Sequence, residues 1–289
     1  MIKKGIILAG GTGSRMSPIT KAVNKQLLPL YDKPLFYYPL SVLMLAKIKD
    51  ILIIVNKGEV DQFKKVLPNG KNLGIKITYA EQESPRGLPD AFIVGEKFIG
   101  NSSVALILGD NFFYGQSLTK KLIQCTRLIK GAKVFLHQVK NPSLYGVAKI
   151  NKKNKIINIA EKPKNSSSNL AITGLYFFDN RVIEFSKTLK PSKRKEIEIV
   201  DLLNKYKKRD MLSAEIIGRG ATWLDTGSIK DYNNTSSFIS TIQNRQGFKI
   251  GCLEEVAFNN KWIQKRHVLS AITFYGKCDY TEYLKIIIN

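Results

Sequence analysis

The chain has few of the residues from which disulfide frameworks and histidine-rich metal sites are built. It contains three cysteines, Cys125, Cys252 and Cys278, an odd number at wide spacing. Its two histidines, His137 and His267, are too few for a histidine-rich metal site, and His137 lies in a strand-like run that favours a structural role. These counts argue against a disulfide scaffold and a zinc knuckle. They fit a reducing compartment, so we expect a cytoplasmic protein.

Long apolar runs are also missing from the sequence. No segment approaches the length needed to span a membrane. The early apolar run ends at Gly10, where a glycine-rich loop begins, and it is therefore not the core of a signal peptide. We expect neither a secretory signal nor a membrane partner.

Acidic residues are scarce: 23 Asp and Glu stand against 46 Lys and Arg, a formal net charge of +23. Such a charge suggests a nucleic-acid-binding protein as one alternative, because clustered cations neutralise phosphates. The lysines are instead scattered through every segment, and no arginine-rich arm, zinc-ligand pattern or nucleic-acid fold signature accompanies them. We expect a solvated, lysine-rich surface that attracts anionic substrates, and no specific nucleic-acid partner.

The composition is that of a globular protein, with 44% hydrophobic and 10% aromatic residues. In the first half, short apolar runs alternate with helical patterns. The runs predict strands at 6–8, 51–55, 75–79, 104–108 and 134–139, and the patterns predict helices at 35–47, 60–67, 88–98 and 118–129. This alternation predicts an α/β fold with a mixed, mostly parallel, doubly wound (Rossmann-like) sheet.

The second half is at first richer in β structure. Strands are predicted at 147–150, 156–160 and 172–178, with a turn at 152–155 and a polar loop at 165–169 between them. Helices are predicted at 181–189, 200–208 and 229–244, and the tail that follows has helical pieces of its own. No linker-like composition and no internal repeat divides the chain.

The most informative motif follows the first strand. Gly10, Gly11 and Gly13 occupy a short loop that Arg15 closes, and Lys25 comes soon after. Consecutive N–H groups in such a turn form a concavity for anions. The spacing differs from that of a dinucleotide-binding loop, which needs a third glycine at position 16, and from that of a Walker A loop. The loop fits a nucleoside triphosphate bound against backbone; the alternative is a glycine-rich turn without a ligand.

Two acidic residues, Asp110 and Asp225, are candidate ligands for Mg²⁺, which prefers oxygen donors. Asp110 follows the strand that ends at Leu108, so it lies at the same sheet edge as the glycine-rich loop after Leu8. Each aspartate alone could be a cap or turn residue. Two carboxylates that converge repel one another, and a divalent cation relieves the repulsion. Replacing either by asparagine is therefore expected to preserve or raise the stability of the metal-free protein.

Further motifs recur along the chain: Lys25-Gln26-Leu27-Leu28-Pro29, Tyr31-Asp32-Lys33-Pro34, Tyr37-Tyr38-Pro39-Leu40, Leu108-Gly109-Asp110-Asn111, Tyr145-Gly146-Val147, Glu161-Lys162-Pro163, Thr173-Gly174-Leu175-Tyr176-Phe177, Trp223-Leu224-Asp225-Thr226-Gly227, and Glu254-Glu255 with Lys261-Trp262-Ile263. In this order, and over nearly the whole length, they resemble the sugar-1-phosphate nucleotidylyltransferase family, and within it the glucose-1-phosphate thymidylyltransferases.

The resemblance implies an enzyme that transfers a thymidylyl group from dTTP to α-D-glucose 1-phosphate by Mg²⁺-assisted direct displacement, giving dTDP-glucose and pyrophosphate. It implies the first step of dTDP-L-rhamnose or related deoxysugar synthesis, and a homotetramer with feedback by a dTDP-sugar. A UTP-using pyrophosphorylase and a catalytically silent sugar-nucleotide sensor are the alternatives. The implied core covers 1–245, with a nucleotide-binding half at about 1–140 and a sugar-binding half at about 141–245, before a C-terminal helical region over 246–289.

The resemblance also assigns site residues. Arg15 and Lys25 would bind the triphosphate and Lys162 the sugar phosphate, and these are the expected catalytic residues. The expected nucleotide-binding residues are Leu8, Gly10, Gly11, Thr12, Gly13, Ser14, Arg15, Lys25, Gln26, Gln82, Gly87 and Asp110; the amides of Gln26 and Gln82 could read a pyrimidine edge. The expected sugar-phosphate-binding residues are Gly146, Glu161, Lys162, Thr173, Tyr176 and Trp223, and the expected metal ligands are Asp110 and Asp225.

Two stretches depart from the family pattern. Residues 85–91 read Pro-Arg-Gly-Leu-Pro-Asp-Ala, where the family usually has an acidic residue before Gly-Leu and then Ala-Gln-Ala. Val200 stands where the family usually has threonine. Neither departure touches the phosphate loop or the acidic pair, and both bear on the base and sugar pockets.

Overall fold

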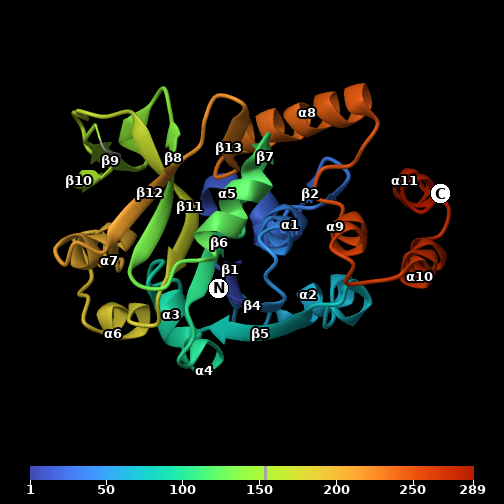
Figure 1. Ribbon diagram of the computed structural model, residues 1–289, viewed down its shortest axis with the longest axis horizontal. Coiled ribbons are helices and arrows are strands. Elements are labelled where there is room, and N and C mark those ends of the chain that lie inside the picture. The colour runs from blue at the N-terminus through green and yellow to red at the C-terminus, as the bar shows by residue number, and fades with distance from the viewer. Residues whose placement is uncertain (153–154) are drawn as a thin grey trace.

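The structure, a computed structural model, describes residues 1–152 and 155–289, and within them a nine-stranded mixed sheet forms the centre of the molecule (Figure 1). Its strands are β1 (Lys4–Leu8), β4 (Asp50–Asn56), β5 (Lys76–Gln82), β6 (Val104–Leu108), β8 (Ala132–Gln138), β9 (Gly146–Ile150), β10 (Ile156–Glu161), β11 (Leu170–Phe178) and β12 (Leu212–Ile216). Their order is β10-β9-β11-β6-β1-β4-β5, with β8 beside β11 and β12 beside β8.

The pairing divides the sheet into two parts. β6, β1, β4 and β5 are parallel, so the C-terminal ends of these strands meet at one edge. β11 then pairs antiparallel with β6, β8 and β9. The predicted mixed, mostly parallel α/β fold with C-terminal helices is confirmed.

Helices cover both faces of this sheet. They are α1 (Tyr37–Leu45), α2 (Val60–Val66), α3 (Asp90–Val94), α4 (Glu96–Ile99), α5 (Leu118–Cys125), α6 (Val182–Lys187), α7 (Ile199–Lys207), α8 (Ile229–Gln246), α9 (Leu253–Asn259), α10 (Lys265–Tyr275) and α11 (Asp279–Ile287). Short 3₁₀ helices are η1 (Ser14–Met16), η2 (Ile19–Lys21), η3 (Lys25–Leu27), η4 (Lys71–Leu73) and η5 (Pro142–Leu144).

The two covered faces explain why the central strands are continuous apolar runs. In β1, Ile7 packs into a core shared with α1, α2, α5 and the helices α9 to α11, whereas Ile6 packs into a second core shared with α3, α6 and α7. Adjacent residues of a strand point to opposite faces, and here both faces are buried. Both isoleucines are accordingly 0% exposed.

Several elements were not predicted. β12 lies at the sheet edge, and two small antiparallel pairs stand outside the main sheet: β2 (Pro29–Leu30) with β3 (Lys33–Pro34), and β7 (Asn111–Gly115) with β13 (Ala221–Asp225). The predicted helix at 88–98 is divided into α3 and α4 at Gly95. The turn expected at 152–155 includes residues 153 and 154, which lie outside the described residues.

A buried carboxylate joins the three C-terminal helices α9, α10 and α11 to one another. Glu254 on α9 is 5% exposed and accepts hydrogen bonds from the hydroxyls of Tyr275 on α10, at 3.2 Å, and Tyr280 on α11. In Figure 1 these helices lie together at the end of the molecule that holds the C-terminus. The division into a core of 1–245 and a helical region of 246–289 stays a prediction.

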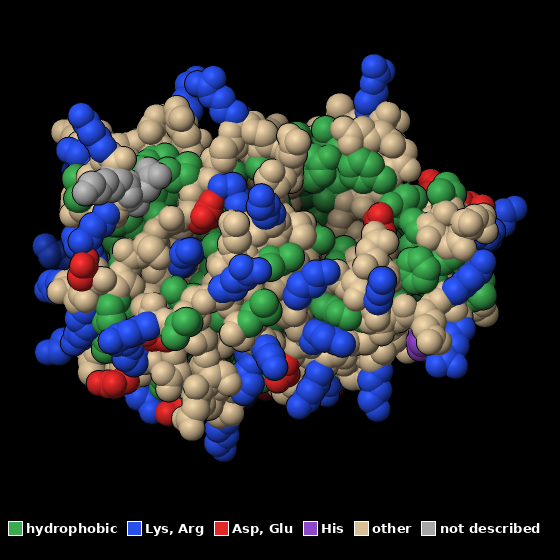
Figure 2. All heavy atoms as spheres, viewed as in Figure 1, with side chains coloured by type: hydrophobic (Ala, Val, Ile, Leu, Met, Phe, Trp, Pro, Cys, Tyr) green, Lys and Arg blue, Asp and Glu red, His purple; other side chains and the backbone are tan. Residues whose placement is uncertain are grey.

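The surface carries the excess of positive charge. Figure 2 shows Lys and Arg side chains spread over one whole face and not gathered into a single stripe. Cys125, Cys252 and Cys278 are free thiols. None of the helices in the described part of the chain has the length and apolar character that crossing a membrane requires. Cytoplasmic location stays a prediction.

Asp179 follows β11 and ties together three parts of the second half. Its carboxylate accepts hydrogen bonds from the Gly131 N–H at 2.6 Å, the Arg181 Nε at 3.0 Å and the Tyr206 hydroxyl at 3.0 Å. Burial alone would raise the pKa of Asp179. The hydrogen bonds from Arg181, Gly131 and Tyr206, with the Arg181 charge, outweigh burial and hold that pKa below its usual 3.8.

We expect Asp179→Asn to lower the free energy of unfolding near pH 7 by about 1.5–3 kcal/mol, because buried donors lose a charged acceptor. A depressed folded-state pKa adds stability above the unfolded-state pKa, and this stability is lost as the pH falls through the folded-state pKa. The difference between wild type and variant should therefore shrink in acid. Urea denaturation between about pH 3 and pH 7 measures it.

The exposed Asp61→Asn is the control, with an expected change within about 0.5 kcal/mol. An Asp179→Asn loss of the same size at every pH would contradict the role of the charge.

Candidate active site

Two adjoining cavities open at the edge where the parallel strands end. The first, of about 310 Å³, surrounds the loop after β1, and the second, of about 230 Å³, lies between the ends of β6, β9, β10 and β11. The residues that line both are Arg15, Leu88, Leu108, Asp110 and Glu196. The two cavities therefore meet at one cation, two carboxylates and the C-terminal end of β6.

Every residue expected to bind nucleotide lines the first cavity. The set comprises Leu8, Gly10, Gly11, Thr12, Gly13, Ser14, Arg15, Lys25, Gln26, Gln82, Gly87 and Asp110. They come from five places in the chain, namely the end of β1 with the loop after it, the 3₁₀ helix η3, the end of β5, the loop before α3 that holds Gly87, and the loop after β6. The parallel pairing of β6, β1, β4 and β5 brings these places to one edge.

The glycine at position 87 is required by the backbone around it. Gly87 has φ of +115°, a conformation that side chains disfavour, and a Cβ there would lie 2.2 Å from the Ile197 carbonyl oxygen. The close approach is held by the Ile197 N–H, which donates to the Arg86 carbonyl at 2.7 Å. The segment before α7 is thereby held against the wall of the first cavity.

Lys25 and Asp110 form a buried ion pair between the two cavities. Lys25 lies on η3, whose first turn is capped by Asn24: its side-chain oxygen accepts from the Gln26 N–H at 2.8 Å. The side chains of Lys25 and Asp110 are 9% and 17% exposed. Burial alone would raise the pKa of Asp110, but the charge and hydrogen bond of Lys25, with a bond from Asn111, hold that pKa below its usual value.

Asn111 orients Asp110, a role that the sequence analysis did not assign. Its amide nitrogen donates to Asp110 Oδ1 at 3.0 Å, and its amide oxygen accepts from the Gly174 N–H at 3.0 Å and from the Trp223 indole. Asn111 is 1% exposed. The only sequence signal was its place in the Leu-Gly-Asp-Asn motif.

The pairing of β7 with β13 brings Asp225 to the same place. Asp225 lies opposite Asn111 in this pair, and the Thr226 N–H and hydroxyl both donate to the Asp110 carbonyl, at 3.1 and 2.8 Å. Burial, followed by the charge of Asp110, raises the pKa of Asp225 to about 7. Unlike Asp110, Asp225 is thus a carboxylate whose charge its surroundings oppose.

This pair of aspartates fits a divalent cation. Both line the second cavity, both offer only oxygen donors, and the charge of one raises the pKa of the other. A cation that needs few carboxylates and completes its shell with phosphate and water matches such a set. Within 1–152 and 155–289, no larger cluster of metal-ligating side chains competes with it.

The second cavity contains most of the residues expected to bind sugar phosphate. Gly146, Glu161, Lys162, Tyr176 and Trp223 line it. Lys162 follows β10 with φ of +40°, a strained value for lysine, so its direction is imposed by the fold. Burial, followed by the charge of Glu198, raises the pKa of Glu161.

Thr173 does not line either cavity. Its side chain is fully buried, and its hydroxyl donates to the Phe135 carbonyl oxygen at 3.2 Å. The neighbouring Gly174 lines the second cavity instead.

The segment before α7 supplies cavity residues that the sequence analysis missed. Arg194 contacts Glu198 at 3.1 Å, Glu196 at 2.9 Å and Glu161 at 3.9 Å. All four line the second cavity. In the sequence this segment is highly charged and indistinguishable from a solvated loop, so no local signal could have assigned it.

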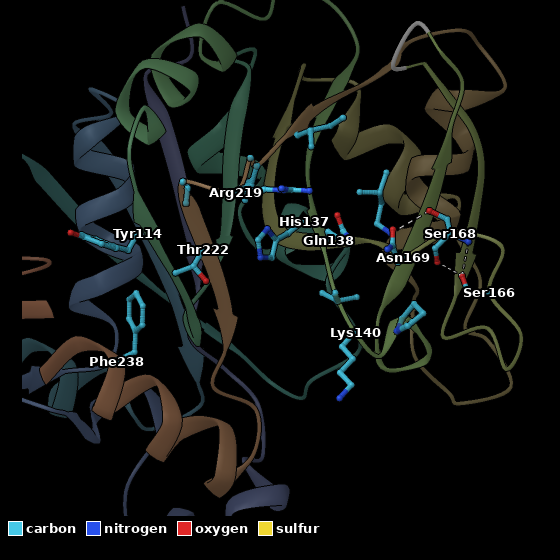
Figure 3. Close-up of a pocket in the computed structure, with 18 of the residues that line it drawn as sticks. Tyr114, His137, Gln138, Lys140, Ser166, Ser168, Asn169, Arg219, Thr222 and Phe238 are labelled. Atoms are coloured by element: carbon cyan, nitrogen blue, oxygen red, sulfur yellow. Dashed lines mark hydrogen bonds between the residues drawn. The ribbon is translucent and has the colours of Figure 1, made fainter. Parts of the chain in front are cut away.

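A larger groove lies elsewhere, and Figure 3 shows its lining. It measures about 1270 Å³ and is bordered by the end of β8, the loop at 166–169 and the turn before β13. His137 and Arg219 point into it. Its described lining includes no carboxylate and none of the sequence-predicted site residues, so the acidic and basic groups needed for phosphate chemistry converge at the two smaller cavities.

The sequence of this chain matches a known family and several known proteins over most of its length. A family profile described as Nucleotidyl transferase matches residues 4–242. Glucose-1-phosphate thymidylyltransferase of Neisseria meningitidis is 51% identical over 281 residues, which cover 97% of this chain and 98% of the relative. The protein of the same name from Neisseria gonorrhoeae is 50% identical over 286 residues and 99% of both chains.

Solved structures share the fold. A protein from Bacillus anthracis, described as glucose-1-phosphate thymidylyltransferase and crystallised with sucrose, has a TM-score of 0.75 and 40% identity, over 81% of this chain and 94% of that one. A UDP-glucose pyrophosphorylase bound to UDP-glucose has a TM-score of 0.74 and 28% identity, over 84% of this chain and 100% of that one.

The two aspartates should respond differently to neutralisation, which changes the expectation that both asparagine variants preserve stability. Asp110→Asn leaves buried Lys25 without its counter-charge and should cost roughly 3–5 kcal/mol. Asp225→Asn removes a charge that burial and Asp110 oppose, so it should preserve or raise stability. Thermal unfolding of both variants at about pH 8 with a chelator measures this.

The two variants are matched controls for one another, since each replaces one carboxylate oxygen by an NH₂ group and removes one negative charge. Equal destabilisation by both would contradict the assignment of Asp225 as a carboxylate whose charge its surroundings oppose.

Proposed function

The chain belongs to the nucleotidyl transferase family and, within it, to the glucose-1-phosphate thymidylyltransferases, and on this premise we propose that it transfers a thymidylyl group from dTTP to α-D-glucose 1-phosphate. The products are dTDP-glucose and pyrophosphate. The observation that carries the proposal is that two cavities meet at Asp110 and Arg15, one formed by the phosphate loop and the other by Glu161 and Lys162.

The reaction is a displacement at the α-phosphorus. A phosphate oxygen of glucose 1-phosphate forms the new bond, and the bond from the α-phosphorus to the bridging oxygen of the β-phosphate breaks as pyrophosphate leaves. Both substrates are anions, so the protein must position them and neutralise their charge. Arg15 and Lys25 are assigned to the triphosphate and the leaving pyrophosphate, and Lys162 to the sugar phosphate.

The remaining groups position these reactants. Glu161 is assigned to accept hydrogen bonds from sugar hydroxyls. Burial and the charge of Glu198 destabilise its carboxylate and raise its pKa, so donors on a bound sugar would stabilise the charged form. Asp110 and Asp225 are the residues that would hold Mg²⁺. Bound there, the ion would stabilise the negative charge of the α-phosphate.

A UTP-using pyrophosphorylase is the second candidate. The similarity to the fold of a UDP-glucose pyrophosphorylase favours it, although the identity of 28% is well below the 51% shared with a thymidylyltransferase. Thymine and uracil differ by one methyl group, which is worth only about 1–3 kcal/mol in discrimination. We further propose that the product enters dTDP-L-rhamnose or related deoxysugar synthesis, and that the enzyme is a homotetramer under feedback by a dTDP-sugar.

Pyrophosphate release across a panel of triphosphates and sugar phosphates tests the proposal. We expect the highest kcat/KM with dTTP and glucose 1-phosphate, and loss of turnover in the presence of a chelator with recovery on adding Mg²⁺. A higher kcat/KM with UTP would favour the second candidate. No pyrophosphate release with any pair would contradict the enzymatic function.

Lys162→Ala should raise the KM for glucose 1-phosphate by about tenfold or more while changing the KM for dTTP little, because it removes a cation from one cavity only. Initial rates with each substrate varied in turn measure the two constants. The exposed neighbour Lys164→Ala is the control. An equal rise in both constants would mean that the two cavities are wrongly assigned.

A further inference from the structure

Asn56, at the end of β4, is bound to both polar groups of Gly11 in the phosphate loop. The Gly11 N–H donates to Asn56 Oδ1 at 2.8 Å, and Asn56 Nδ2 donates to the Gly11 carbonyl oxygen at 3.0 Å. A backbone N–H can only donate and a backbone carbonyl can only accept. The backbone of Gly11 therefore determines which end of the Asn56 amide carries the oxygen.

The same Asn56 oxygen reaches the side chain of Gln82. Gln82 Nε2 donates to Asn56 Oδ1 at 3.1 Å. The Gln82 amide lies close to the loop: a Cβ on Gly10 would be 2.0 Å from Gln82 Nε2. Because Asn56 presents an acceptor, Gln82 must turn its NH₂ group toward Asn56. Its carbonyl oxygen accepts no hydrogen bond from the residues that the structure describes, although Gln82 lines the nucleotide cavity and is 5% exposed.

The carboxylate of Glu59 connects Asn56 to Asn24. Glu59 Oε2 accepts from the Asn56 backbone N–H at 3.2 Å and from the side chain of Asn24 at 2.5 Å. Asn24 also donates to the Ala9 carbonyl at 3.0 Å and caps the 3₁₀ helix that carries Lys25. Asn56 and Asn24 therefore both hydrogen-bond to the glycine-rich loop or the residue before it, and both donate to the Glu59 carboxylate, Asn56 through its backbone N–H. Backbone groups fix the orientation of both side-chain amides.

We propose that Asn56 is a positioning residue that transmits the polarity of the Gly11 backbone to Gln82, so that the Gln82 carbonyl oxygen faces the base and selects pyrimidines that carry an N–H at position 3. Thymine and uracil have this N–H, whereas cytosine has an unprotonated nitrogen there and would face the Gln82 oxygen with a second acceptor. The inference rests on the proposed function, because it takes the base to lie beside Gln82.

The arrangement predicts which discrimination depends on Asn56 and which does not. Without Asn56 the Gln82 amide can rotate by half a turn and donate to cytosine as readily as it accepts from thymine. Discrimination against cytosine should then fall. Discrimination between thymine and uracil depends on a methyl group and should be unchanged. A loss of loop structure alone would weaken all nucleotides together.

The experiment compares wild type with Asn56→Ala, Asn56→Asp and Gln82→Ala. Equilibrium binding of dTTP, dUTP and dCTP and kcat/KM for each are measured together with thermal unfolding. Asn56→Ala should reduce the preference for dTTP over dCTP by at least about tenfold, the worth of one good hydrogen bond, with the dTTP to dUTP ratio unchanged. Asn56→Asp keeps an acceptor toward Gln82 and should keep the preference within about threefold of wild type.

Combining Asn56→Ala with Gln82→Ala gives a stricter test. If Asn56 acts through Gln82, it should have no further effect on the preference once Gln82 is removed. Asn56→Ser, whose hydroxyl is too short to reach Gln82, replaces the alanine variant if the latter does not fold. The exposed Asn101→Ala is the control for loss of an asparagine.

An unchanged dTTP to dCTP preference in folded Asn56→Ala, or equal weakening of all three nucleotides, would overturn the proposal. If wild type binds dTTP selectively but releases no pyrophosphate, the proposed function fails while the binding ratios still decide the role of Asn56.

Discussion

The ion pair of Lys25 and Asp110 is the contact on which the geometry of the site depends. It joins the 3₁₀ helix after the phosphate loop to the end of β6, elements 85 residues apart in sequence. Both side chains are largely buried, so each charge is stable there only with the other. Lys25 lines the nucleotide cavity, and Asp110 lines both cavities. One contact therefore places the cation proposed to bind phosphate and a proposed metal ligand at the same time.

The same principle extends through the site, where cations are held by carboxylates of the protein itself. Arg194 is paired with Glu198 and contacts Glu161, as Lys25 is paired with Asp110. The surroundings of Asp225 instead oppose its charge and raise its pKa to about 7, so a positive charge placed beside this carboxylate would be favourable. Each of these ion pairs is neutral, so the net charge of +23 comes from other Lys and Arg residues, many of which lie on the surface (Figure 2). Such a surface raises the local concentration of anions.

Much of this architecture could be predicted from the sequence because it follows from local patterns. Buried parallel strands are continuous apolar runs, and loops after such strands meet at one edge, so the glycine-rich loop and Asp110 could be placed together. Asn111 and Arg194 could not, since each acts through contacts with residues distant in sequence. β7 and β13 pair across more than a hundred residues and have no local signature. Thr173 was assigned to the sugar from its motif, but a strand alternates its faces, and this side chain points into the protein.

The departures of residues 85–91 from the family pattern compensate one another. Arg86 pairs with Asp90 at 2.6 Å, and Asp90 is 2% exposed, so an aspartate at position 90 without Arg86 would be a buried carboxylate lacking its cation. The Asp90 N–H also donates to the Gly87 carbonyl oxygen at 3.2 Å, and Gly87 has the positive φ and the close contact with Ile197 described above. Val200 lines the second cavity and is 5% exposed, so there the departure exchanges a hydroxyl for a methyl at the cavity wall. The changes thus alter the walls of the site and leave the positions of its charged groups intact.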